Sequence, residues 1–187
     1  FTITELITET LRYRLSQQKQ TGEKTDWQEA RRWCADIVAA MQFLHTQDPM
    51  LTHHDLKSEN CLLSDTDTVK IADFGAVTRA FKTPNIPHNN IKDPAIAEND
   101  FVSSLMTTST RAGTPLWMAP EVMSDKYEWS ECGPEVDVYS FAMVMYEIAT
   151  QQLPFPQCVQ MYTFQFNAYV IGGGRPEIPE LLLQQSK

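Results

Sequence analysis

Apolar side chains recur at intervals of three and four residues between Thr25 and Leu44. Thr25 and Gln28 have the spacing of a capping box, in which two reciprocal hydrogen bonds satisfy the first backbone N–H groups of a helix. The pattern therefore predicts an amphipathic helix that starts near Thr25, ends near Leu44 and buries one face. The apolar positions that define it are Ala30, Trp33, Cys34, Ile37, Val38, Met41 and Leu44.

Shorter elements are expected on both sides of this helix. Before it, the β-branched run Phe1–Leu6 predicts a short strand, Glu9–Gln17 a brief amphipathic helix, and the polar residues 18–24 a loop. After it, the apolar runs Cys61–Leu63 and Val69–Ile71 are joined by residues typical of turns, which predicts a small β-hairpin.

The stretch Val138–Ala149 is apolar nearly all round. A helix that is apolar on every face is expected to be buried on every face, so this one would be the central pillar of the domain. Residues 80–110, by contrast, are rich in proline, asparagine and aspartate, which predicts a long loop of the kind that is functional or disordered. The expected fold class is α+β, mainly helical with one or two short hairpins.

Composition limits the function. The chain has 187 residues, enough for one domain, and a formal net charge of −9 from 24 acidic and 15 basic side chains. A chain with so little basic charge does not fit the phosphate backbone of nucleic acid, so no nucleic-acid partner is expected. A nucleotide is still compatible, because carboxylates can hold it through Mg²⁺.

The cysteines and the apolar runs indicate where the protein works. Cys34, Cys61, Cys132 and Cys158 have no C-x-x-C spacing, which favours reduced thiols over a disulfide framework and hence a cytoplasmic, intracellular protein. No signal-peptide pattern opens the chain, and no apolar run reaches the roughly 18 residues of a membrane span. An anchor elsewhere in a longer protein stays open.

Four motifs carry the chemistry. In chain order they are His53-His-Asp-Leu-Lys-Ser-Glu-Asn60, Asp73-Phe-Gly75, Gly113-Thr-Pro-Leu-Trp-Met-Ala-Pro-Glu121 and Asp137-Val-Tyr-Ser-Phe-Ala142. They resemble the catalytic loop, the Mg-binding loop, the end of the activation segment and the start of the buried helix of eukaryotic protein kinases. Each motif alone could be an ordinary polar loop, but their shared order and spacing favour the kinase interpretation.

Phosphoryl transfer needs positioning and charge stabilisation more than covalent chemistry. Asp55 is suited to accept or orient the proton of the attacking hydroxyl, and Lys57 can meet the transferring phosphoryl group as a point charge. Asp73 and the amide oxygen of Asn60 are suited to hold Mg²⁺ against the phosphates of ATP. The catalytic candidates are therefore Asp55, Lys57, Asn60 and Asp73, of which Asn60 and Asp73 are the metal candidates.

Other positions are assigned by the resemblance alone. His53 and Phe74 would pack in the column that couples the two loops, with Gly75 next to them, and Asp137 would accept hydrogen bonds from catalytic-loop backbone. Glu121 would pair with an arginine further along the chain, which is not Arg175. The run before Glu9 would be the hinge. Its adenine-binding residues would be Thr4, Glu5, Leu6 and Ile7, joined by Leu62.

The resemblance extends to a subgroup. Lys57 and Gly113-Thr114 resemble serine/threonine kinases, and Trp117-Met-Ala-Pro-Glu121 with Gly174-Arg-Pro176 resembles the tyrosine-kinase-like group of them. It implies that residues 1–187 are a partial domain, hinge and C-terminal lobe, with the N-terminal lobe absent and the fragment itself inactive. The activation segment 73–121 would carry an insert at about 82–106. In the full-length protein the partners would be ATP, Mg²⁺ and a protein substrate with a serine or threonine hydroxyl.

Two departures from the family pattern matter. His54 replaces the arginine that commonly receives an activation-loop phosphate, and a histidine is a weaker, pH-dependent partner. Possible phosphate acceptors are Thr107, Thr108, Ser109 and Thr110, although this cluster is equally well a polar stretch of loop. His54 also keeps open the alternative of a pseudokinase or scaffold. A small-molecule phosphotransferase is a further alternative, disfavoured by the segment that ends at Glu121.

Overall fold

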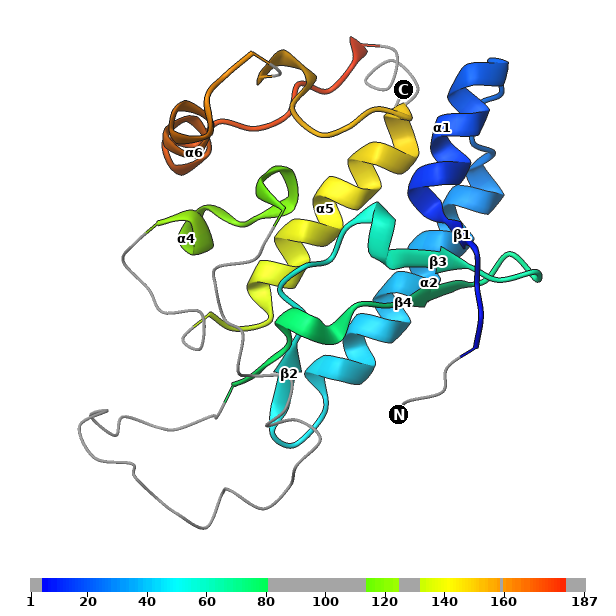
Figure 1. The fold of residues 1–187 in the computed structure, drawn as a ribbon, viewed down its shortest axis with the longest axis horizontal. Helices are drawn as coiled ribbons and strands as arrows, with labels where there is room; N and C mark the ends of the chain where they lie inside the picture. Colours follow the sequence, from blue (N-terminus) through cyan, green and yellow to red (C-terminus); the bar gives the residue numbers. More distant parts are fainter. Residues whose placement is uncertain (1–4, 81–113, 125–131, 159, 181–187) are drawn as a thin grey trace.

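The computed structural model describes residues 5–80, 114–124, 132–158 and 160–180. Helices and short strands are mixed along the chain (Figure 1). The helices are α1 (Leu11–Thr21), α2 (Trp27–His45), α4 (Pro120–Met123), α5 (Glu135–Thr150) and α6 (Thr163–Ile171). The strands are β1 (Glu9–Thr10), β2 (Met50–Thr52), β3 (Cys61–Leu63), β4 (Val69–Ile71) and β5 (Thr78–Ala80). Single 3₁₀ turns are η1 (Ser58–Asn60), η2 (Phe74–Ala76), η4 (Pro115–Trp117) and η6 (Pro156–Cys158).

The N-terminal elements differ from the sequence prediction. Residues 1–4 of the expected strand lie outside the described residues, Glu5 and Leu6 are not in a strand, and β1 forms at Glu9–Thr10 instead. Helix α1 starts later and ends later than expected, because the Thr10 side chain accepts a hydrogen bond from the backbone of Tyr13 and Gly22 ends the helix at φ 75°. The expected loop at 18–24 is therefore largely the last turn of α1.

Helix α2 is the helix that the apolar periodicity predicts. Its cap is Asp26 rather than Thr25: the Asp26 carboxylate accepts from the backbone N–H of Gln28, while the Thr25 hydroxyl donates to Gln18. The buried face carries four apolar side chains, but Val38 is 48% exposed, so the apolar stripe is wider than the face that is covered. The buried four are Trp33, Ile37, Met41 and Leu44.

The predicted hairpin is present. Strands β3 and β4 pair antiparallel, with Leu62 opposite Lys70, and β1 joins the other edge of β3, with Thr10 opposite Leu62. A second, separate pair joins β2 to β5, with Thr52 opposite Thr78. The first sheet packs against α2, whose Asp36 accepts the backbone N–H of Val69 at 2.9 Å.

Helix α5 runs through the middle of the molecule, beside α2 and the loops of the site (Figure 1). Met143, Val144 and Ile148 of this helix are buried in the apolar core shared with α1, α2 and β3. The expectation of burial on every face is nevertheless wrong, because Val138 is 62% and Met145 41% exposed. Cys34, Cys61 and Cys158 are free thiols, and no described helix is long and apolar enough to cross a bilayer.

Candidate active site

Asp137 fixes the backbone of the segment that carries the catalytic candidates. It lies in the first turn of α5, is 1% exposed, and accepts the backbone N–H of His53 at 2.8 Å and of His54 at 2.9 Å. His45, at the end of α2, adds a third hydrogen bond of 2.8 Å. Burial raises the pKa of Asp137, but these three hydrogen bonds outweigh it and lower the pKa overall, so the charged form is favoured.

Asp55, Lys57 and Thr114 meet in one cluster. The Lys57 ammonium donates to Asp55 Oδ2 and to Thr114 Oγ1, both at 2.8 Å. The Thr114 hydroxyl donates to Asp55 Oδ1 at 3.2 Å. A carboxylate and an ammonium therefore lie side by side, and Thr114, the first residue of the segment 114–124, contacts both. Thr114 belongs to the motif that ends at Glu121, but no sequence pattern indicated that it would contact Asp55.

Asn60 completes this loop and is held in a defined orientation. Its side-chain amide nitrogen donates to the backbone carbonyl of Asp55 at 2.8 Å and to Asp55 Oδ2 at 3.2 Å. Its own backbone carbonyl accepts from Ala72, one residue before Asp73. With the nitrogen committed, Oδ1 of Asn60 is the atom that can serve as a metal ligand.

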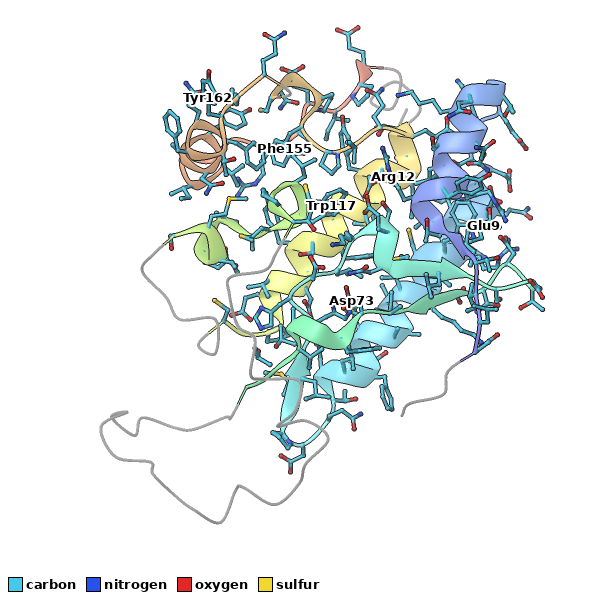
Figure 2. All side chains as sticks on the ribbon, viewed as in Figure 1. Glu9, Arg12, Asp73, Trp117, Phe155 and Tyr162 are labelled. Carbon is cyan, nitrogen blue, oxygen red and sulfur yellow. The ribbon has the colours of Figure 1, made fainter. Side chains whose placement is uncertain are left out.

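Asp73 follows strand β4 of the hairpin by two residues and directly precedes η2, where Figure 2 labels it. It adopts a left-handed conformation, φ 63° and ψ 73°, and its Oδ1 accepts the backbone N–H of Gly75 at 3.3 Å. A Cβ at position 75 would lie 3.2 Å from that oxygen, so glycine permits the close approach. The rings of His53 and Phe74 are 5.4 Å apart, which couples the two loops.

His54 does not face solvent as a phosphate-binding cation would. The imidazole is 8% exposed, and its Nε2 lies 2.5 Å from the hydroxyl of Thr78 on β5. Burial lowers the pKa of His54, which disfavours the charged form. With its charged form disfavoured, His54 would be a weaker phosphate partner than an arginine, and whether it receives a phosphate stays a prediction. The four hydroxyl residues 107–110 and the insert at about 82–106 lie outside the described residues.

The expected hinge residues are only partly placed. Thr4 lies outside the described residues, Leu6 is 88% exposed, and Glu5 forms an ion pair with Lys70 of β4. Since Lys70 is opposite Leu62 in the sheet, Glu5 and Leu62 lie on neighbouring parts of one surface. Glu121 lies in α4, and Arg175 instead places its guanidinium 5.4 Å from the centre of the Tyr139 ring.

A buried carboxylate connects the loop 53–60 with the segment 114–124 through hydrogen bonds. Glu147 of α5 is fully buried and accepts hydrogen bonds from Ser58 and from the indole of Trp117, both at 2.7 Å. The Arg12 guanidinium of α1 lies 3.4 Å from the Glu147 carboxylate. Arg12 and Trp117, two of its partners, are labelled in Figure 2. Burial raises the pKa of Glu147 to about 7. The sequence analysis missed this residue, although it is the one charged position inside the apolar run 138–149.

The oxygens of Asn60 and Asp73 fit a magnesium ion. Both are hard ligands, and Mg²⁺ bound with a nucleotide uses one or two protein carboxylates together with phosphate and water oxygens. Among the described residues there is no group of three or more histidine, cysteine or carboxylate side chains arranged for a metal ion.

Several known protein kinases are similar to this chain in amino-acid sequence. Serine/threonine-protein kinase CTR1 of Arabidopsis thaliana is 31% identical over 82% of the chain, and serine/threonine-protein kinase WNK3 of Mus musculus is 34% identical over 83%. Dual specificity protein kinase shkC of Dictyostelium discoideum is 35% identical over 79%. The chain spans 16%, 7% and 24% of the length of these three relatives, respectively.

The profile of one family, described as the protein kinase domain, matches residues 2–171. That range contains Asp55, Lys57, Asn60 and Asp73, as well as the two elements that hold them, the β3–β4 hairpin and α5. The chain belongs to the eukaryotic protein kinase family.

Proposed function

We propose that this chain is the hinge and C-terminal lobe of a serine/threonine kinase of the tyrosine-kinase-like group. In the full-length protein it would transfer the γ-phosphate of ATP to a protein hydroxyl. The observation that carries the proposal is the contact of Asp55 with both Lys57 and Thr114, next to the oriented amide of Asn60. These contacts support a site in which Asp55 would accept the proton, Lys57 would be the cation and Asn60 would be a metal ligand.

Each side chain has a defined task in this proposal. Asp55 orients the acceptor hydroxyl and takes its proton, because its carboxylate is held in place by hydrogen bonds from Asn60 and Lys57. Lys57, whose ammonium donates to Asp55, would supply the positive charge that meets the incoming phosphoryl group. Magnesium, when bound by Asn60 and Asp73, would neutralise phosphate charge.

The adenine would contact the surface formed by residues 5–7 and Leu62; Thr4, the remaining adenine candidate, lies outside the described residues. Leu6 is 88% exposed, so its side chain is accessible to a ligand. The glycine-rich phosphate loop and the phosphate-pairing lysine would come from an N-terminal lobe. The chain by itself is then expected to be inactive.

The test is a phosphotransfer assay on the full-length protein with Asp55→Asn. Proton acceptance by a positioned carboxylate contributes about 10²- to 10⁴-fold, so kcat should fall at least 100-fold. Mg-ATP affinity should change little, whereas Asp73→Asn should weaken it. The matched control is Asp65→Asn, an exposed aspartate in the turn of the β3–β4 hairpin. Wild-type phosphotransfer by Asp55→Asn would contradict the assignment.

The pseudokinase alternative has one observation in its favour, the burial of the His54 imidazole against Thr78. A pseudokinase would bind nucleotide or a protein partner without turnover. The same experiment separates the two, because a pseudokinase gives no phosphotransfer in the wild-type protein that Asp55→Asn could reduce.

A further inference from the structure

A groove of about 840 Å³ opens next to the proposed catalytic cluster. Its walls are the outer face of α1, the start of η4, and the segment 151–163 that follows α5. Figure 2 shows Arg12 on one side of this region and Phe155 on the other. The floor is apolar, with contributions from Leu116, Leu153 and Phe166.

The groove continues from the reaction site along the chain. Thr114 contacts both Asp55 and Lys57, and the two residues that follow it, Pro115 and Leu116, line the groove. A polypeptide whose hydroxyl lies at Asp55 therefore meets this groove as soon as it extends past Thr114. An apolar floor of this kind can hold an extended peptide backbone without specifying its sequence.

The positive charges that line the groove would determine which peptides it binds. Arg12 and Lys19, two turns apart on α1, line the groove, and no carboxylate is among its described lining residues. This is unusual in a chain with a net charge of −9. Two acidic groups act nearby: Glu147 contacts Arg12 from the buried side, and the charge of Glu177 contributes to raising the pKa of Cys158 at the far end.

Neither acidic group cancels the two cations. The Arg12 side chain is 29% exposed while Glu147 is fully buried, so the outer part of the guanidinium faces the groove. Because burial raises the pKa of Glu147 to about 7, that carboxyl carries only part of a charge near neutral pH. Lys19 is exposed, and within the described chain no carboxylate lies within ion-pair distance of it.

We propose that this groove binds aspartate and glutamate side chains of the protein substrate that flank the acceptor hydroxyl, with Arg12 and Lys19 as the specificity-determining residues. The inference rests on the proposed kinase function and narrows its substrate class to serine or threonine in an acidic sequence. Exposed ion pairs are weak one by one, so the two together are expected to give about a 3- to 10-fold preference.

The experiment compares two synthetic peptides with the full-length protein. One has the acceptor serine between runs of aspartate and glutamate, and the other has asparagine and glutamine at the same positions. Binding is measured by fluorescence anisotropy and turnover by kcat/KM. The wild type should prefer the acidic peptide about 3- to 10-fold in both, and the preference should shrink as salt rises from about 0.05 to 0.5 M.

The variant Lys19→Glu should abolish the preference for the acidic peptide in both binding and kcat/KM, because it replaces one of the two cations of the groove by a carboxylate. Lys24→Glu makes the same charge change at an exposed lysine that does not line the groove, and should keep the preference. Equal binding of both peptides to the wild type would overturn the inference, as would an equal effect of the two variants. If acidic peptide binds selectively but neither peptide is phosphorylated, the groove assignment stands and the kinase proposal fails.

Discussion

Asp137→Asn changes one oxygen to a nitrogen in the side chain that holds the proposed catalytic loop. The wild-type carboxylate accepts from His45 and His53 on Oδ2, and from His54 on Oδ1. An asparagine has a single acceptor oxygen. In its better orientation the asparagine keeps the two partners of Oδ2. It then turns an N–H group toward the backbone N–H of His54, and the hydrogen bond between His54 and residue 137 is lost.

The cost can be worked from these contacts. A lost buried hydrogen bond costs about 1–3 kcal/mol, and the two remaining hydrogen bonds each lose about 1 kcal/mol when the acceptor is no longer charged. The sum is about 3–5 kcal/mol, a large share of the stability of a typical domain. For a domain of this size that corresponds to a fall of about 6–20 °C in Tm.

Thermal unfolding of the wild type, of Asp137→Asn and of the exposed Asp65→Asn control measures this difference. The folded pKa of Asp137 is lowered, so its contribution is present above the unfolded pKa of about 3.9 and is lost as pH falls through the folded value. The gap in Tm should therefore be constant from pH 5 to 8 and narrow below pH 4. A variant as stable as the control at pH 7 would refute the argument.

Two further changes test the core. Because the pKa of Glu147 is raised to about 7, its ionisation destabilises the fold as pH rises from the unfolded value to about 7, so Glu147→Gln should gain up to about 3 kcal/mol over wild type between pH 5 and 8. Urea unfolding at both pH values measures this, and an equal difference at both would contradict it. Ile37→Ala, at a fully buried position of α2, should cost about 2–5 kcal/mol, and the neighbouring Val38→Ala under about 1, in the same urea assay; similar losses would argue against the burial of α2 described above.

The sequence predicted the long helices and the hairpin better than it predicted their ends. Apolar spacing identifies α2 because a helix repeats every 3.6 residues, whatever packs against it. Its cap was placed one residue early, since Thr25 and Asp26 are both good caps and only the backbone conformation at Asp26 decides between them. Exposure of Val138 also escaped prediction, because apolar composition does not say what covers each face.

The residues of the site were predicted from motifs, whereas the network beneath them was not. Asp55, Asn60 and Asp73 belong to two of the four motifs, and the shared order and spacing of these motifs suggested a common site. Glu147 takes its partners from positions 30, 89 and 135 residues away. No local pattern joins such distant positions, and a lone acidic residue in an apolar helix indicates only that some partner must exist.

The pairing of β2 with β5 has a consequence for how the molecule moves. The rung between Thr52 and Thr78 closes a loop that contains residues 53–77, and with them all the catalytic candidates. A loop tied at its base opens as one cooperative unit, because losing that rung frees both ends together. Hydrogen exchange at the backbone amides of His53 and His54, which donate to Asp137, should therefore rise and fall in step with exchange in the two strands at the base of the loop.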